Sequence, residues 1–167
     1  MSLNSKIVAQ IVATHTSALD LGTASLPLTV TERISLASGT GANQADRIFS
    51  DTRTLTASAT EDLDLAGSLT DAFGATITFA RIKAIMVSAA AANTNNVNVA
   101  RAAANGVPLF LAAGDAVPVL PGGILLWAAP NAAAIAVTAG TGDLITVTNS
   151  GAGTSVTYDI VIIGASA

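Results

Sequence analysis

The clearest alternation of hydrophobic and polar positions lies near the C-terminal end, between Thr154 and Gly164 (TSVTYDIVIIG). Successive side chains of a strand point to opposite faces, so this segment predicts a strand with one entirely apolar face. That face carries Val156, Tyr158, Ile160 and Ile162. The other face carries Thr157 and Asp159 and becomes apolar only at Val161 and Ile163, which predicts that this end is covered on both sides. So much Val and Ile favours a central position in a sheet.

A second strand is predicted immediately before it, from Asp143 to Asn149 (DLITVTN). Ser150 to Gly153 (SGAG) separates the two segments and has the composition of a turn. The pair therefore predicts a closing β-hairpin.

Further short apolar segments follow one another through the middle of the chain, separated by Gly, Pro and Asn turns. A strand is expected to begin at Leu55, and others are expected at Leu28–Ala37, Glu61–Leu65, Thr76–Ser88, Val97–Arg101, Val107–Leu111, Ala116–Leu120, Ile124–Ala128 and Ala134–Thr138. Helix is the alternative at Thr76–Ser88 because Ala is abundant there, but its Thr, Ile and Phe content and its alternating charges favour strand. Turn signals at this spacing are typical of a sandwich or barrel. We predict an all-β fold, a jelly-roll-like β-sandwich.

The N-terminal part has a different character. Lys6–Thr16 (KIVAQIVATHT) is β-prone and predicts an extended arm or an edge strand. Ser38–Gln44 (SGTGANQ) is a Gly/Ser/Asn loop and marks a boundary. We therefore predict an N-terminal arm or small β region over residues 1–42 and a β-sandwich body over residues 43–167.

Charged residues make up 11% of the chain, against roughly 25% in typical soluble domains. Either Thr, Ser, Asn and Gly solvate the surface, or much of the surface is buried against other chains. Beyond Arg101 the only charged residues are Asp115, Asp143 and Asp159. This C-terminal third is expected either at an interface between subunits or as a sheet core with Thr/Ser faces.

Several classes of function conflict with the composition. The net charge is −4 and the basic residues are scattered, which argues against a nucleic-acid partner. The chain has no cysteine, so disulfides and thiolate metal sites are excluded. Ile124–Ala129 is too short to span a membrane, and no segment reaches the roughly 18 apolar residues needed.

Catalytic chemistry has little support in the sequence. His15 is the only histidine, and no Gly-x-Ser-x-Gly motif is present for a serine nucleophile. Glu61, Asp62, Asp64 and Asp71 form one acidic cluster. Leucines alternate with the first three, as on a strand with one solvated face, and a Ca²⁺ site is the alternative. We expect no enzymatic activity, no cofactor and no metal site.

Trp127 lies in a short apolar segment (LLWA) and is either a core aromatic or an interface anchor. The arm is suited to adding a strand to a neighbour's sheet edge. The residues predicted at interfaces are Ile7, Val8, Ile11, Val12, Trp127, Val161 and Ile163.

Three segments resemble small structural proteins encoded among the virion genes of tailed bacteriophages. They are Ala45–Asp51 (ADRIFSD), Asp64–Gly74 (DLAGSLTDAFG) and Asp143–Gly164. Within that group the size, β-richness and low charge look most like a capsid decoration (cement) protein. The resemblance implies a virion location on the capsid surface, the major capsid protein as partner and a homo-oligomer, with a trimer favoured. The alternative is a tail, fibre or baseplate component that recognises a host surface.

Overall fold

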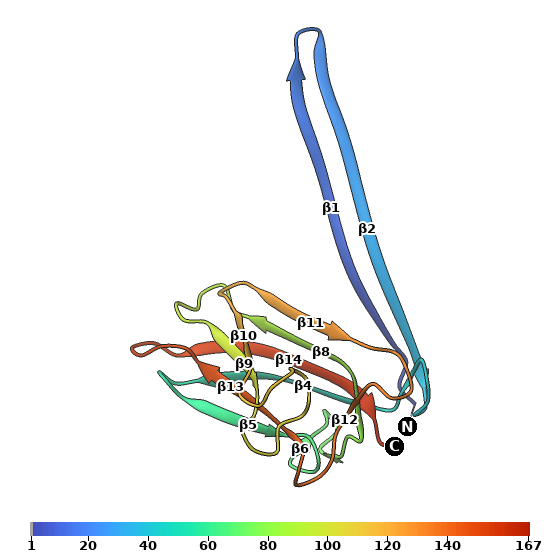
Figure 1. Ribbon diagram of the computed structural model, residues 1–167, viewed down its shortest axis with the longest axis vertical. Helices are drawn as coiled ribbons and strands as arrows, with labels where there is room; N and C mark the ends of the chain where they lie inside the picture. Colours follow the sequence, from blue (N-terminus) through green and yellow to red (C-terminus); the bar gives the residue numbers. More distant parts are fainter. Residues whose placement is uncertain (1) are drawn as a thin grey trace.

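The computed structural model describes residues 2–167, and over this range the regular structure consists of β-strands without helices. A long hairpin projects from one end of a two-layered β-sandwich body (Figure 1). The predicted all-β sandwich class is therefore confirmed.

One sheet of the body has the strand order β11-β8-β14-β4, with β12 beside β8. The bounds are β4 Arg47–Leu55, β8 Arg81–Ala89, β11 Ile124–Ala128, β12 Ile135–Ala136 and β14 Val156–Ala165. The other sheet has the order β10-β9-β13-β5. Its strands are β5 Thr60–Asp64, β9 Val97–Arg101, β10 Ala116–Val119 and β13 Leu144–Asn149. A small ribbon, β6 (Leu69–Thr70) with β7 (Thr76–Ile77), lies outside these sheets.

The main core fills the space between the sheets. The predicted apolar face of β14 supplies Val156, Tyr158, Ile160 and Ile162, each at most 1% exposed. Ile145 and Val147 of β13 meet this core from the opposite sheet and are fully buried. β14 pairs with β8 on one side and β4 on the other, so its predicted central position is confirmed.

The predicted closing hairpin is wrong. β13 pairs with β5 and β9, whereas β14 lies in the opposite sheet. The segment between the two strands crosses from one layer to the other. Strands of both sheets bury one face in the core and so share the same alternation of apolar and polar side chains. A short Ser/Gly connection is compatible either with a hairpin within one sheet or with a crossing between the two layers.

Other boundaries also differ from the prediction. Val107–Leu111 forms turns and bends, not a strand: Val107 alone is buried, and Pro108 lacks the N–H of a central strand. A strand ends at Leu55, where one was expected to begin. Thr76–Ser88 is extended as predicted but is interrupted between β7 and β8.

The projecting hairpin consists of β1 (Ser5–Leu19) and β2 (Gly22–Ser38), joined by Asp20 and Leu21. Both strands are longer than the sequence predicted. β1 continues past Thr16 to Leu19, and β2 begins before Pro27 and runs through it. Pro27 is tolerated because a two-stranded ribbon is all edge, so a proline nitrogen can face solvent. After a loop, β3 (Gln44–Ala45) returns parallel to the end of β2.

Candidate interaction surface

The two faces of the hairpin differ in polarity. The register pairs Ile7 with Ile34, Ile11 with Val30 and Ala13 with Leu28, and residues two apart share a face. We call this side the apolar hairpin face; it comprises Ile7, Ala9, Ile11, Ala13, His15, Ser17, Leu19, Gly22, Ala24, Leu26, Leu28, Val30, Glu32 and Ile34. The opposite face is mostly polar, and there Gln10 Nε2 donates a 2.9 Å hydrogen bond to Thr31 Oγ1 across the strands.

Most of the apolar hairpin face lies against solvent. Ile11 is 66% exposed, Leu26 68% and Leu28 52%. A two-stranded hairpin is at best marginally stable alone in water, and its stability normally comes from packing one face on another layer. This ribbon therefore carries an apolar face that the rest of the chain does not cover.

Near the body the same face is covered. Ile7 and Ile34 pack on a second core cluster, separate from the main core, whose buried members are Leu36, Ala45, Ala84 and Ile163. Val161 and Ala128 border this cluster. The prediction that the Val161/Ile163 end of β14 is covered on both sides is confirmed for Ile163, which is buried beneath the base of the chain's own hairpin, whereas Val161 is half-buried.

Hydrogen bonds hold the connection between β2 and β4 to the rest of the body. Asn43 N donates to Pro130 O at 2.7 Å, and Asp46 N donates to Gly164 O at 3.1 Å. The Asp46 carboxylate accepts from Ser166 N at 2.9 Å and from Ser166 Oγ at 2.6 Å. These contacts anchor the segment through which the hairpin continues into β4.

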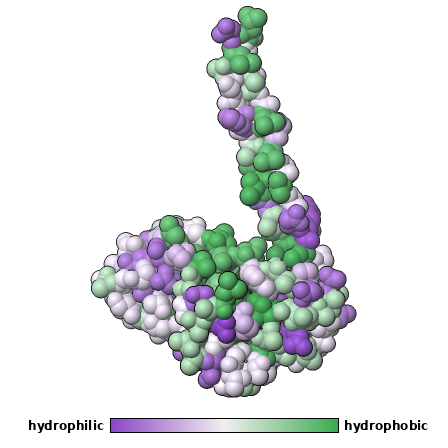
Figure 2. All heavy atoms as spheres, viewed as in Figure 1, coloured by the Kyte–Doolittle hydropathy of each residue, from purple (hydrophilic) through white to green (hydrophobic). Residues whose placement is uncertain are grey.

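Apolar side chains continue from the hairpin base across the outward side of the β11-β8-β14 sheet. Met86 is in register with Leu126 on one side and with Val161 on the other. Leu126 is 38% and the neighbouring Ile124 is 67% exposed. We call these four residues the outer sheet face. Hydrophobic side chains are visible in Figure 2 along the hairpin and over the adjoining part of the body.

A groove of about 300 Å³ lies in the corner between the hairpin and the outer sheet face. We call it the base groove; its lining residues are Lys6, Ile7, Val8, Ala84, Met86, Leu126, Val161 and Ile163. The lining is apolar apart from Lys6, whose side chain forms no ion pair within residues 2–167.

The predicted interface residues fall into three environments. Ile7, Val8, Val161 and Ile163 line the base groove, so the structure brings these four together. Ile11 and Val12 are each 66% exposed on opposite faces of the hairpin. Trp127 is half-buried and packs against the main core, on the side of β11 that faces away from Leu126. Sequence reasoning missed Leu26, Leu28 and Leu126, although the alternation around Ile11 and Val30 carries the signal for the first two.

A polar cluster joins the two sheets. Glu61 of β5 accepts hydrogen bonds from Arg53 Nε at 2.8 Å and from Tyr158 Oη at 2.7 Å. Arg53 also contacts Asp51 at 2.9 Å. Burial and the hydrogen bond to Glu61 raise the pKa of Tyr158 above its ordinary value, and the Glu61 hydrogen bond raises the pKa of Arg53. The Glu61 carboxylate, the Arg53 guanidinium and the Tyr158 hydroxyl are thus hydrogen-bonded to one another, so the cluster supports the fold.

The remaining carboxylates of the acidic segment serve separate local roles. Asp62 accepts from Thr146 Oγ1, Asp64 accepts from Ala66 N, and Asp71 accepts from Phe73 N and Ala75 N. Within residues 2–167 no group of three or more His, Asp or Glu side chains is arranged to hold a metal ion. His15 lies on the exposed hairpin, opposite Leu26.

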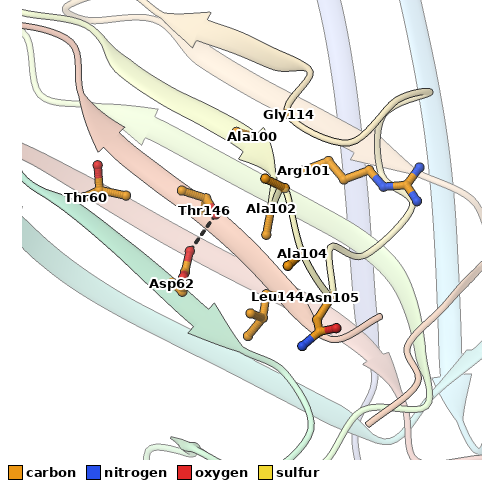
Figure 3. A pocket seen from close by; sticks show the side chains of 11 residues that line it. Thr60, Asp62, Ala100, Arg101, Ala102, Ala104, Asn105, Gly114, Leu144 and Thr146 are labelled. Atoms are coloured by element: carbon orange, nitrogen blue, oxygen red, sulfur yellow. Dashed lines mark hydrogen bonds between the residues drawn. The ribbon is translucent and has the colours of Figure 1, made fainter. Parts of the chain in front are cut away.

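A shallow depression of about 430 Å³ lies on the outward side of the β9-β13-β5 sheet. Small side chains such as Thr60, Ala100 and Thr146 line it. Thr146 Oγ1 of β13 donates a 2.5 Å hydrogen bond to Asp62 Oδ1 of β5 (Figure 3). The Arg101 guanidinium points away to the carbonyls of Phe110 and Leu111. The buried Arg101 Nε atom has no hydrogen-bond partner within residues 2–167, and apart from the Asp62–Thr146 bond the lining consists mainly of small apolar side chains.

Comparison with protein-family models, curated proteins and solved structures found no match to this chain. Among residues 2–167 no helix is long and apolar enough to cross a membrane. The hairpin, the base groove and the outer sheet face are therefore the features on which a function can be argued.

Proposed function

We propose that the protein is a structural virion component that decorates and stabilises a phage capsid by binding the lattice of the major capsid protein. The observation that carries the proposal is the long projecting hairpin, in which the outer edge of β1 pairs with no strand of residues 2–167. A protein that joins neighbouring subunits needs a body that rests on one of them and an element that reaches the next. The sequence resemblance to phage virion proteins supports the same role.

The dimensions of the hairpin suit this task. Fifteen residues in β1 span about 50 Å at roughly 3.3 Å per residue. Within residues 2–167 β1 pairs with β2 alone, so its other backbone edge is unpaired along the strand. Such an edge can add to the sheet of a neighbouring capsid subunit, with affinity from main-chain hydrogen bonds.

The connectivity supports a jelly-roll interpretation of the body. Its strands longer than three residues are β4, β5, β8, β9, β10, β11, β13 and β14. Apart from β9 and β10, each successive pair along the chain alternates between the two sheets. Jelly rolls share this double-sheet winding and occur in viral capsid proteins, among others.

Electron microscopy of the parent particle tests the location. We expect density for the sandwich body on the outer surface of the head, repeated with the capsid lattice. Density confined to the tail or baseplate would overturn the proposal in favour of the alternative, a host-recognition component.

Add-back to particles lacking the protein tests the mechanism. One variant replaces residues 10–31 by Asn-Gly, which joins the register pair Ala9/Glu32 through a two-residue turn. We expect full-length protein to restore capsid resistance to heat and the shortened protein to bind at least about tenfold more weakly. Thr14→Ala is the matched control, because it changes one polar side chain on the same part of the hairpin and should bind normally. Equal binding by the shortened variant would contradict a role for the hairpin.

A further inference from the structure

We infer that the base groove and the outer sheet face receive the apolar hairpin face of a second copy of this chain, so that the copies form a closed oligomer by exchanging hairpins. This inference concerns contacts between identical chains and does not depend on the capsid. It begins from two apolar surfaces that the chain leaves at least partly uncovered. They are the apolar hairpin face and the outer sheet face, where Ile124 and Leu126 are exposed and Met86 and Val161 are half-buried.

Within one chain, the base of the hairpin already packs on the outward side of the β11-β8-β14 sheet. At the base of the hairpin, Ile7 and Ile34 pack against the second core cluster, which includes Ala84 and Ile163 on the outward side of the same sheet. Farther along the hairpin the same face continues with Ile11 and Val30, now without a partner. Farther across the sheet the same side continues with Met86 and Leu126 beside the groove. A second copy's hairpin on these residues would extend a contact that the chain makes with itself.

Charge complementarity favours the second copy as the occupant. The apolar hairpin face carries one carboxylate, Glu32, and the base groove is bordered by one ammonium group, Lys6. Neither side chain forms an ion pair within residues 2–167. Placing Glu32 of one copy beside Lys6 of the next would pair both charges at the edge of an otherwise apolar contact.

The same carboxylate disfavours another symmetric arrangement. Hairpins bundled in parallel around an axis, with their apolar faces inward, would bring every copy's Glu32 together. Like charges in an apolar environment repel strongly and are poorly solvated. Docking the hairpin on the body of the next copy avoids this convergence.

The area that one hairpin contact can bury favours a closed oligomer. From Ala9 to Leu19 the ribbon is about 35 Å long and about 10 Å wide, so one contact buries roughly 350 Å² on each side, about 700 Å² in total. A stable interface needs about 1,000 Å² or more, so one such contact falls short. In a closed oligomer every copy donates one hairpin and receives one, so each takes part in two contacts. Closure also prevents open-ended growth into filaments.

The purified full-length protein, without capsids, provides the test. We expect light scattering after size-exclusion chromatography, over a series of concentrations, to give the mass of a dimer or trimer. A monomer at every concentration would overturn the inference while leaving the capsid role open, since capsid binding is measured separately.

Two residues with equal exposure give a matched pair of variants. Ile11 and Val12 are each 66% exposed but lie on opposite faces of the hairpin. We expect Ile11→Asp to raise the dissociation constant of the oligomer by at least about tenfold and Val12→Asp by less than about twofold. Leu126→Asp, on the body, should act like Ile11→Asp. Far-ultraviolet circular dichroism and thermal melting check that the body remains folded. Equal effects at positions 11 and 12 would overturn the inference.

A charge exchange tests the contact itself. Glu32→Lys and Lys6→Glu should each weaken the oligomer, and the protein carrying both changes should regain most of the lost affinity. A mixture of the two single variants should form mixed oligomers, because the unaltered Lys6 of one can still meet the unaltered Glu32 of the other. Failure of the double variant to recover would overturn the proposed placement of the hairpin.

Discussion

Tyr158 Oη donates a 2.7 Å hydrogen bond to Glu61 Oε1 and so links β14 of one sheet to β5 of the other. Tyr158 is 1% exposed, and Arg53 fixes the same carboxylate from β4. Three strands from both layers therefore meet at one carboxylate.

Tyr158→Phe should lower the free energy of unfolding by about 1–2 kcal/mol, because it removes a hydrogen bond to a charged acceptor and keeps the ring in place. Denaturant titration measures the difference. Thr54→Val is the matched control, because it removes a 3.1 Å hydrogen bond to Thr157 on the exposed side of the same strands. We expect that control to change stability by less than about 0.5 kcal/mol. Comparable losses in both variants would contradict a special role for the link between sheets.

The same tyrosine gives the protein a definite response to alkaline pH. Burial, together with the hydrogen bond to Glu61, raises the pKa of Tyr158, so the folded state favours the neutral phenol. Its contribution to stability is fully present below the ordinary tyrosine pKa near 10 and is lost as the pH rises above it, at up to about 1.4 kcal/mol per pH unit. Because the chain has one tyrosine, absorbance of the phenolate should appear only together with unfolding. Ionisation of Tyr158 in the folded protein near pH 10 would contradict this.

Lys83 is fully buried, and its ammonium group donates to the carbonyl oxygens of Asn131 and Ala132. Burial, with a smaller contribution from Arg81, lowers the pKa of Lys83. Lys83→Met should change stability by no more than about 1 kcal/mol at neutral pH, because the cost of burying the charge disappears with its hydrogen bonds. Asn131 and Ala132 are exposed, so water can hydrogen-bond to their carbonyl oxygens in the variant that lacks the ammonium group.

The pH dependence separates this site from Tyr158. A lowered lysine pKa means that the unfolded chain binds more protons, so the wild-type protein gains stability as the pH rises towards 10.5. The Lys83→Met variant should lack that gain. Lys83→Glu, which buries a carboxylate facing two carbonyl oxygens, should cost more than about 3 kcal/mol. A harmless Lys83→Glu variant would contradict the buried position.

Gly164 lies where the pairing of β14 with β8 shifts register. A Cβ atom there would lie 2.2 Å from Arg81 O and 2.6 Å from the Phe79 ring. Gly164→Ala should therefore destabilise the body by about 2–4 kcal/mol, measured by thermal or chemical denaturation. Gly22→Ala is the control, since a Cβ there meets no atom within 4 Å and the change should be nearly neutral. Equal stability of the two variants would show that the bulge can relax.

Much of the body could be predicted from local alternation. Ile160 and Ile162 are buried between the sheets as their pattern indicates, and at the apolar end of the other face Ile163 is buried while Val161 is half-buried. Alternation reports which face of a strand is buried, but not which sheet the strand joins. The crossing between β13 and β14 therefore looked like a hairpin.

The candidate interaction surface was only partly predictable for a related reason. Ile11 and Val12 stand next to each other in an apolar segment, and only the pairing with β2 shows that Ile11 belongs to a continuous apolar face and Val12 to the polar one. Trp127 and Leu126 show the same limit. The aromatic side chain attracted the interface prediction, yet it packs on the core, while its smaller neighbour lines the base groove.

The junction at Asp46 has a mechanical consequence. The hairpin stands at an angle to the strands of the body, and the chain passes from it through β3 directly into β4, the edge strand paired with β14 (Figure 1). A pull on the hairpin would therefore peel β4 from its Arg47 end, one residue pair at a time, instead of shearing all the pairs at once. The Asp46 bonds to Gly164 and Ser166 lie where that peeling force enters the sheet. Asp46 is therefore the first residue through which a force on the hairpin reaches the pairing of β4 with β14.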